Sequence, residues 1–326
     1  MTNVHDQHLT ERVALYNADT VEIARSLPDR SVDFSVFSPP FSSLYVYTSS
    51  ERDMGNVRSE EEFWGQYRFL IRESRRVMKA GRLIAIHCMD LPTSKAMHGY
   101  IGIRDFPGEI IRAYEAEGFI FHSRVTIWKD PVTAMQRTKA LGLLHKQIRK
   151  DSSMSRVGIP DYLVVMRTPG ENPDRIAHTH DEFPVERWQR YASPVWAVVN
   201  GVDDEGFGVC SADIDQSDTL QARSAREHKD ERHLAPLQLE VIRRAVRLWS
   251  APDDWVWSPF AGIGSEGYVS IQEGRRFIGA ELKSSYYRQA VANLQAAERS
   301  TKGDLFAWGE ERSTSHPVTA EAPGIS

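Results

Sequence analysis

The sequence has little cysteine and no long apolar run. Its two cysteines, Cys88 and Cys210, stand far apart and form neither a metal-type nor a redox-type pair, so we expect a reducing compartment. No apolar stretch approaches the roughly 20 residues of a membrane helix. Residues 1–10 are polar and lack the apolar centre of a signal peptide. These absences argue against a disulfide scaffold, a membrane-spanning protein and a secreted protein, and they predict a cytoplasmic one.

An excess of basic residues is also missing. The formal net charge is −5, which disfavours a broadly basic nucleic-acid-binding surface. Only the contacting face must be positive, however, so the charge distribution matters more than the total. The histidines show no spacing with cysteines or carboxylates that specifies a metal. We therefore predict that no metal is required.

Predicted strands alternate with predicted helices along most of the chain. We expect strands at 13–17, 33–37, 83–86, 119–128, 161–166, 255–258 and 276–280, and helices at 21–27, 59–81, 109–117, 237–249, 266–273 and 284–298. Such alternation predicts an α/β fold, a doubly wound and mostly parallel Rossmann-like sheet with helices on both faces. Residues 169–231 break the rhythm and are interpreted as an irregular insertion. The tail at 300–326 is polar, contains proline and is predicted to be disordered.

Glycines follow the apolar run 255–258 and precede a predicted helix. The pattern Gly262-x-Gly264-x-x-Gly267 permits a tight turn and a close approach of a ligand to the backbone. Glu281 ends the next predicted strand, where its carboxylate could accept hydrogen bonds from both ribose hydroxyls. The pattern predicts a nucleoside-cofactor site; the alternative is a glycine-rich turn beside a surface glutamate.

The glycine pattern alone also fits a nicotinamide dinucleotide. Two details disfavour that ligand: the loop lies near the end of the chain, and Ser258-Pro259-Phe260-Ala261 places a proline and an aromatic ring directly before the glycines. An aromatic ring there could lie along a purine or a sulfonium group by stacking or cation–π attraction.

A second segment, Ser38-Pro39-Pro40-Phe41, closes the predicted strand 33–37. Ligands gather at the carboxyl ends of strands in open α/β sheets. The Ser38 hydroxyl and the Pro39 carbonyl could accept the two N–H bonds of an adenine or cytosine amino group and aim its lone pair at an electrophilic methyl group. Phe41 could stack on the ring, and a duplex base would have to flip out to arrive there. Alone, this segment is more often a rigid turn; together with the glycine loop it predicts a site.

The two segments together resemble the motifs of S-adenosylmethionine-dependent DNA amino-methyltransferases. Ser38-Pro39-Pro40-Phe41 matches their [Asp/Asn/Ser]-Pro-Pro-[Tyr/Phe/Trp] signature, and the segment from Ser258 to Gly264 resembles their Asp-Pro-Phe-x-Gly-x-Gly loop. The catalytic motif comes first, which is the order of the beta class. Within that class the chain is most similar to orphan methyltransferases of phages and prophages. The resemblance covers roughly residues 13–168 and 232–298.

The resemblance implies an organisation and a set of ligand contacts. It implies a catalytic half at 11–168, a target-recognition insertion at 169–231 and a cofactor half at 232–299. Asp19 would bind the adenine amino group of S-adenosylmethionine and Glu281 its ribose. The other implied cofactor-binding residues are His233, Pro236, Gln238, Pro259, Phe260, Ala261, Gly262, Gly264 and Ser265. The substrate would be double-stranded DNA, the enzyme a homodimer, and its location the cytoplasm of a bacterium or phage-infected cell.

Two positions depart from the family pattern. Ser258 replaces the common aspartate of the cofactor loop, so water or backbone would have to supply the hydrogen bonds of that aspartate. Ser38 replaces the aspartate typical of many adenine enzymes, and a serine there is associated with cytosine N4 methylation although adenine enzymes also carry it. The resemblance to phage enzymes slightly favours adenine N6, with cytosine N4 as the alternative.

One basic stretch stands out in this acidic chain. Residues 129–150 contain only one acidic residue, Asp130, and could neutralise phosphates through Lys129, Arg137, Lys139, Lys146, Arg149 and Lys150. The alternative is an ordinary solvated helix face whose other side packs on the protein through Leu141, Leu143, Leu144 and Ile148. Two further hypotheses for the whole chain are a nicotinamide-dependent oxidoreductase and a non-catalytic DNA-binding regulator that kept the fold.

Overall fold

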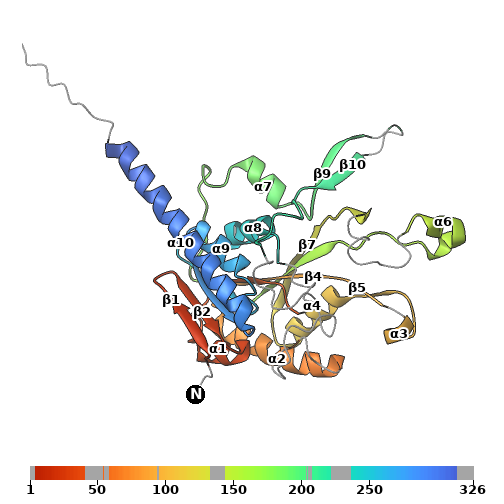
Figure 1. The fold of residues 1–326 in the computed structure, drawn as a ribbon, viewed down its shortest axis with the longest axis horizontal. Helices are drawn as coiled ribbons and strands as arrows, with labels where there is room; N and C mark the ends of the chain where they lie inside the picture. The colour runs from red at the N-terminus through yellow and green to blue at the C-terminus, as the bar shows by residue number, and fades with distance from the viewer. Residues whose placement is uncertain are drawn as a thin grey trace, which may run out of the picture.

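The structure, a computed structural model, describes residues 4–40, 54, 59–93, 95–132, 144–202, 204, 208–221 and 236–313. Within these ranges a ten-stranded sheet forms the centre of the molecule, in the order β1-β2-β12-β11-β3-β4-β8-β7-β9-β10 (Figure 1). The strands are β1 (Asp6–Leu9), β2 (Val13–Asn17), β3 (Phe34–Phe37), β4 (Leu83–Met89), β7 (Ile120–Ile127), β8 (Asp161–Arg167), β9 (Val195–Val202), β10 (Gly208–Ala212), β11 (Trp255–Ser258) and β12 (Arg276–Glu281). A separate ribbon joins β5 (Leu91–Pro92) to β6 (Ile103–Arg104).

The middle of the sheet is parallel, from β2 through β12, β11 and β3 to β4. Its strands are largely apolar, and all four residues of β3 are buried, as expected for strands covered on both faces. β8 runs antiparallel between β4 and β7. The predicted α/β fold with a mostly parallel sheet is therefore confirmed.

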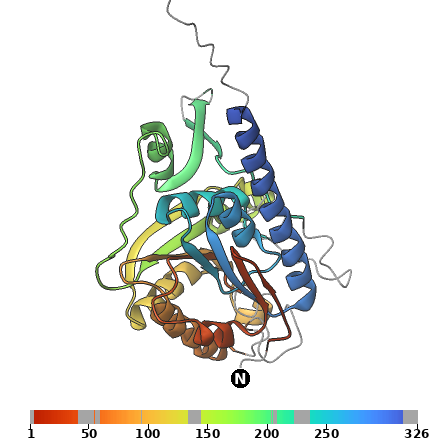
Figure 2. The ribbon, with the colours of Figure 1, turned by 90° about the vertical axis from the view of Figure 1, so that its left-hand side faces the viewer.

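Helices cover both faces of the sheet (Figures 1 and 2). One layer contains α1 (Thr20–Ser26), α2 (Glu60–Val77) and α4 (Phe106–Ala116), and the other contains α8 (Leu239–Trp249), α9 (Ser265–Gln272) and α10 (Ser284–Ser313). Smaller helices are α3 (Lys95–His98), α6 (Lys146–Asp151), η2 (Ser152–Met154) and α7 (Val185–Tyr191). No helix among the described residues is long and apolar enough to cross a membrane.

Local capping explains where two helices begin. Ser59 Oγ accepts a hydrogen bond from the Glu62 backbone N–H, which is one of the two bonds of a capping box, at the start of the helix predicted at 59–81. The helix expected at 109–117 begins earlier, at Phe106, because the Asp105 side chain accepts from the Gly108 N–H and Pro107 occupies the first turn.

The chain connections that follow two neighbouring strands, β11 and β3, run to opposite sides of the sheet. The chain leaves β11 through α9 towards β12, and it leaves β3 through α2 towards β4, on the opposite side. β11 and β3 are neighbours and run parallel. Their carboxyl ends therefore form a topological switch point, the place where ligands bind in open α/β sheets.

Two stretches contain more regular structure than the sequence predicted. Residues 169–231 are not wholly irregular, because β9 pairs in parallel with β7 and extends the sheet. The run Val195-Trp196-Ala197-Val198-Val199 is rich in residues that favour strands, and Trp196 is buried. The helix α10 ends at Ser313 and so extends into the tail predicted at 300–326. The tail has no proline before Pro317, so no proline breaks the helix earlier.

Candidate active site

The two segments singled out in the sequence lie side by side at the switch point. β11 pairs with β3 in the register Trp257↔Ser35, and the Ser35 hydroxyl donates a hydrogen bond of 2.8 Å to the Trp257 carbonyl. The Phe260 ring lies 5.7 Å from the Phe37 ring, between centroids, and stacks on Tyr67 at 6.4 Å. Ser38 is half-buried, and Pro39 and Pro40 are buried. Residues far apart in the sequence are thus brought to one edge of the sheet.

The glycine loop has the conformation that its glycines permit. Gly262 and Gly264 have φ angles of 52° and 84°, in the left-handed region that favours glycine. A Cβ added to Gly262 would meet no atom of the described residues within 4 Å, so space remains open beside the loop. Pro259 and Ala261 are buried, and the Ala261 N–H donates to the Ala280 carbonyl at 2.9 Å.

Glu281 fixes this loop to the end of β12. Its Oε2 accepts from the Gly262 N–H and its Oε1 from the Lys283 N–H, both at 2.8 Å. A carboxylate oxygen can accept more than one hydrogen bond. The arrangement can present a carboxylate to a ribose beside an open glycine loop.

Asp19 lies at the neighbouring strand end. β2 and β12 pair in the register Asn17↔Glu281, and the Asn17 side-chain amide donates to the Glu281 carbonyl at 2.8 Å. The Asp19 Oδ1 accepts from the Val21 and Glu22 N–H groups and thereby caps α1. Oδ2 takes part in neither bond and can serve as an acceptor for a ligand.

Several buried polar atoms near this edge have no protein partner in the described part of the chain. They are Thr20 Oγ1, Gln238 Oε1, Ser258 Oγ and Ser265 Oγ. A buried hydroxyl or amide without a partner costs about 1–3 kcal/mol. Ser258 and Ser265 flank the glycine loop, Thr20 follows Asp19, and Gln238 precedes α8, next to the half-buried Pro236. A polar ligand of nucleoside type fits these groups.

A buried carboxyl not singled out in the sequence lies in the first turn of α9. Glu266 is buried. Burial, and then the negative charge of Glu281, raise the pKa of Glu266 to about 8. This carboxyl is therefore neutral at pH 7, whereas the sequence alone indicates an ordinary charged glutamate.

Ser38 begins a chain of polar contacts that sequence reasoning missed. Its hydroxyl lies 3.3 Å from Nδ1 of His87, and Nε2 of His87 lies 3.0 Å from Oδ2 of Asp161. The same carboxylate oxygen pairs with the Lys129 ammonium. Burial acts to raise the pKa of Asp161, but His87 and Lys129 outweigh it and hold that pKa below its usual value. The available signal was a histidine in the otherwise apolar strand Leu83–Met89.

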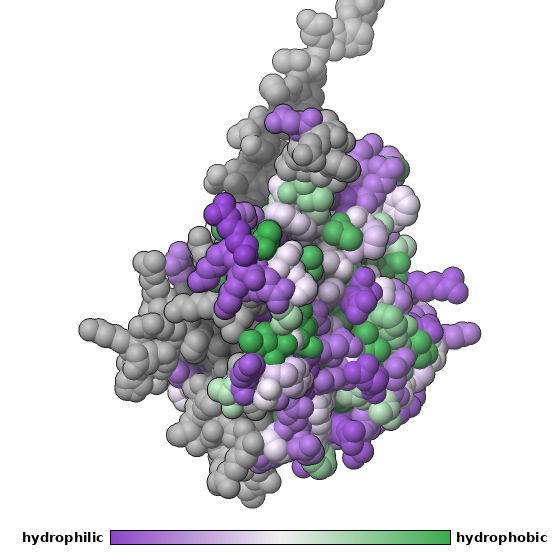
Figure 3. Space-filling model, turned by 90° about the vertical axis from the view of Figure 1, so that its right-hand side faces the viewer, coloured by the Kyte–Doolittle hydropathy of each residue, from purple (hydrophilic) through white to green (hydrophobic). Residues whose placement is uncertain are grey.

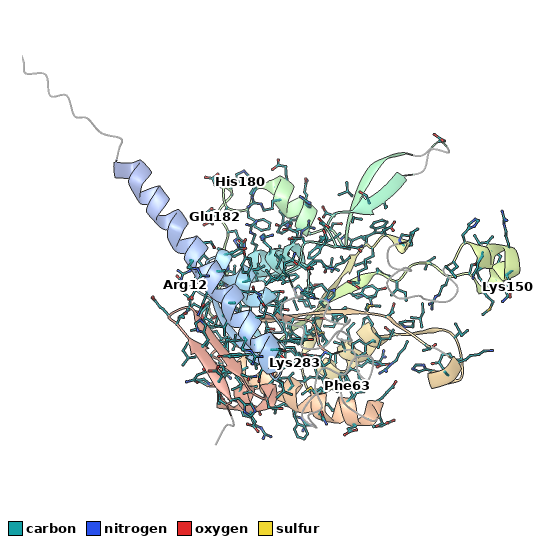
Figure 4. The ribbon with its side chains drawn as sticks, viewed as in Figure 1. Arg12, Phe63, Lys150, His180, Glu182 and Lys283 are labelled. Atoms are coloured by element: carbon teal, nitrogen blue, oxygen red, sulfur yellow. The ribbon has the colours of Figure 1, made fainter. Side chains whose placement is uncertain are left out.

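Lys129 was predicted to contact DNA phosphates, and the structure places it elsewhere. Its ammonium is paired with Asp161, a carboxylate that is only 2% exposed. The positive charge of Lys129 is therefore neutralised inside the protein and does not serve a DNA phosphate. Lys146, Arg149 and Lys150 are exposed on α6, which projects from the body (Figures 1 and 4). Ile148 is 56% exposed, so the packed helix side of the alternative interpretation is not found there.

The surface seen from the α3 and α6 side is mixed, with hydrophobic patches between hydrophilic groups (Figure 3). Within the described ranges no group of three His, Cys, Asp or Glu side chains could hold a metal ion. Four predicted site residues lie outside those ranges: Phe41, Arg137, Lys139 and His233.

Several known proteins with a similar sequence or fold are methyltransferases. The DNA methylase family matches this chain over residues 32–292. The type II methyltransferase M.BglII of Bacillus subtilis is 25% identical over 285 residues, 86% of this chain and 67% of its own. M.Cfr9I of Citrobacter freundii is 25% identical over 293 residues, 87% of this chain and 88% of its own. A Thermus thermophilus protein assigned as a DNA modification methylase, solved with S-adenosyl-L-methionine, shares the fold with a TM-score of 0.59 at 21% identity, over 88% of this chain and 95% of its own.

Proposed function

Since the chain belongs to the DNA methylase family, we propose that it transfers a methyl group from S-adenosylmethionine to the exocyclic amino group of a base in double-stranded DNA. One observation carries this proposal. The Ser38 segment and the glycine loop end neighbouring parallel strands and are joined by the Phe37–Phe260 contact. A methyl donor on one loop and an amino acceptor on the other would then meet, which is catalysis by positioning.

The cofactor assignment is supported by the solved relative that holds S-adenosyl-L-methionine and by the residues present. We infer that Asp19 accepts from the adenine amino group and Glu281 from the ribose hydroxyls. The open space beside Gly262 and the unpartnered hydroxyls of Ser258 and Ser265 suit the methionine part. Family membership disfavours the nicotinamide interpretation of the same loop, and calorimetry with each ligand separates the two.

The target base would be held by Ser38, Pro39 and Phe41. The Ser38 hydroxyl and the Pro39 carbonyl would accept the two amino hydrogens, and Phe41 would stack on the flipped ring. Adenine N6 remains slightly favoured over cytosine N4. The support is the resemblance to beta-class orphan enzymes of phages, since a serine at position 38 suits either base.

DNA contacts are assigned to α6 and to residues 169–231. Lys146, Arg149 and Lys150 would neutralise phosphates, and the segment that contains α7, β9 and β10 would recognise the target sequence. A homodimer acting on DNA in the cytoplasm is the assembly that the beta-class resemblance supports.

Methyl transfer to unmethylated DNA tests this proposal. Tritiated S-adenosylmethionine should label DNA, and hydrolysis followed by chromatography should yield N6-methyladenine, or N4-methylcytosine if the alternative base is the target. Ser38→Ala should lose most of the label, whereas Ser123→Ala, a serine on β7, should not. If the DNA of diverse sequence stays unlabelled by the wild type, the chain is instead a regulator that kept the fold.

A further inference from the structure

Four side chains from four separate segments form one line of contacts that ends at Ser38. Ser38 follows β3, His87 lies in β4, Asp161 begins β8 and Lys129 follows β7. Resting on the proposed function, we propose that His87 is a positioning residue that takes the Ser38 hydroxyl proton during methyl transfer, oriented by Asp161 and Lys129. The proposal deepens that function, because it says where the proton of the reacting amino group goes.

The strand register explains how the line is built. Met89 lies opposite Asp161 in the antiparallel β4–β8 pair, and His87 is two residues earlier on the same strand. His87 and Asp161 are therefore diagonal neighbours on one face of the sheet. Their side chains are 11% and 2% exposed, so this pair is shielded from water and strengthened by its surroundings.

The charge on Asp161 selects the tautomer of His87. An ionised carboxylate accepts hydrogen bonds only, so the nitrogen that faces it, Nε2, must carry the proton. Nδ1 is then left as an acceptor towards the Ser38 hydroxyl at 3.3 Å. With the proton on Nδ1 instead, the Ser38 hydroxyl would have to donate to the His87 carbonyl oxygen, 3.4 Å away. The unprotonated Nε2 and the Asp161 carboxylate oxygen would then be two acceptors facing each other. The Lys129 ammonium holds Asp161 in its ionised form.

The step balances in atoms and charge. A bond forms between the base nitrogen and the methyl carbon as the sulfur–methyl bond of S-adenosylmethionine breaks, so the sulfonium becomes a neutral thioether and the nitrogen becomes cationic. The nitrogen loses a proton to Ser38 Oγ while the Ser38 proton passes to Nδ1 of His87. The resulting imidazolium is stabilised by Asp161, and it later releases the proton to water. The products are the methylated base, S-adenosylhomocysteine and one proton.

A purely structural role predicts something different from these contacts. Asp161 leaves its second oxygen, Oδ1, buried and without a partner in the described ranges. A carboxylate that served packing alone would be expected to have both oxygens satisfied. The line also ends at the half-buried Ser38, at the edge where the base is proposed to bind.

A pair of variants tests the relay. In His87→Asn the amide oxygen can still accept from Ser38 but cannot take its proton. With enzyme in excess over unmethylated genomic DNA and tritiated S-adenosylmethionine, the single-turnover rate should fall about 100-fold or more, while the Kd values for cofactor and DNA stay within about threefold of wild type. In a Ser38→Ala background the same change should cost nothing further, because the two residues act in series. His122→Asn, a histidine beside Ser123 on β7, is the matched control and should behave as wild type.

The tautomer gives a readout independent of activity. In protein labelled with ¹⁵N-histidine, the His87 signals, assigned by their loss in His87→Asn, should report protonation at Nε2 and not at Nδ1. An Nδ1-protonated ring, an unchanged single-turnover rate in His87→Asn, or a full additional loss in the Ser38→Ala background overturns the relay alone. A wild-type enzyme that labels no DNA overturns the proposed function as well.

Discussion

At the scale of single residues, Asp19 combines a structural role, the cap of α1, with its proposed role as a cofactor ligand. Its Oδ1 caps α1 through Val21 and Glu22. The sequence resemblance predicts Asp19 as a cofactor ligand, but the cap follows only from the helix boundary at Thr20. A simple alanine substitution would therefore mix two effects, removal of the cap and removal of the hydrogen bond to the ligand.

Asp19→Ser separates these two effects. Serine caps a helix about as well as aspartate, whereas alanine costs about 1 kcal/mol. We expect Asp19→Ser to unfold near the wild-type temperature but to bind S-adenosylmethionine about tenfold more weakly, since about 1.4 kcal/mol is lost with the hydrogen bond. Asp19→Ala should lose both stability and affinity. Thermal unfolding and calorimetry measure the two quantities, and unchanged affinity in Asp19→Ser would remove Asp19 from the site.

Glu266 predicts a pH dependence of stability. Burial, then the charge of Glu281, raise the pKa of Glu266 from 4.5 to about 8. Between these pH values the folded state keeps a proton that the unfolded state has lost, so the free energy of unfolding falls as the pH rises. The stabilisation from this group is complete below pH 4.5 and is lost as the pH rises through about 8.

Glu266→Gln should remove this dependence, because glutamine does not titrate. The variant and the wild type should unfold at similar temperatures at pH 5, and the variant should be the more stable of the two at pH 9. Thermal unfolding across that range checks it, with Glu115→Gln on the exposed side of α4 as the control. A stability difference that does not change with pH would show that the buried carboxyl is not protonated at neutral pH.

Sequence reasoning singled out the proposed site residues that belong to contiguous motifs and did not single out those that lie outside such motifs. Ser38 and the glycine loop could be read from short patterns, and the structure brings them together. His87 and Asp161 could not, because their contact depends on the β4–β8 register, which no local pattern encodes. The sequence could not show that Lys129 pairs with Asp161, because this buried partner lies on another strand. Lys129 was therefore predicted to bind DNA.

At the scale of elements, most helices and strands of the sheet follow from local patterns. The helix predicted at 59–81 is found as α2, which Ser59 caps, and the strands predicted for the centre of the sheet are found as well. β9 was missed because its partner, β7, lies far away in the sequence and because residues 169–194, directly before β9, are largely polar. Gly267 shows a further tertiary constraint: a Cβ there would lie 2.6 Å from Leu294 Cδ2, so this glycine lets α9 approach α10.

Two glycines with similar backbone conformations allow a matched test of the loop. Gly262 and Gly274 both have positive φ angles, 52° and 78°, and a Cβ on either would meet nothing within 4 Å. Alanine at either position should cost about 1 kcal/mol of stability through left-handed strain. Only Gly262→Ala should also weaken S-adenosylmethionine binding, by about tenfold or more, because a loss of about 1.4 kcal/mol is tenfold in Kd and its methyl group enters the proposed cofactor space. Calorimetry of both variants measures this, and equal affinities would place the cofactor elsewhere.

At the scale of the whole molecule, the charge distribution matters more than the total. The chain carries a net charge of −5, yet α6 projects three exposed cations: Lys146, Arg149 and Lys150. Binding to DNA through such a projection should weaken steeply as salt increases, because each phosphate contact releases counterions.

Replacing these three cations by glutamine should reduce the salt dependence of DNA binding. The slope of log K against log salt should become shallower by up to about 0.9 for each phosphate that is no longer neutralised. Fluorescence anisotropy with labelled duplex DNA at several salt concentrations measures the slope. A control with Arg25, Arg68 and Arg299 replaced by glutamine, exposed cations on α1, α2 and α10, should keep the wild-type slope. Equal slopes in both triple variants would exclude α6 from the DNA-binding surface.

The ion pair between Lys129 and Asp161 also joins the two ends of the segment that contains α6, and we call this junction the neck. Lys129 follows β7 and Asp161 begins β8, so the chain that contains α6 leaves the sheet at one partner and returns at the other. Closing a longer loop costs little more than closing a shorter one. The segment beyond the neck can therefore change in length and sequence while His87 stays in register. In evolutionary terms, we expect the length of this projecting segment to vary between lineages while the proposed proton relay is kept.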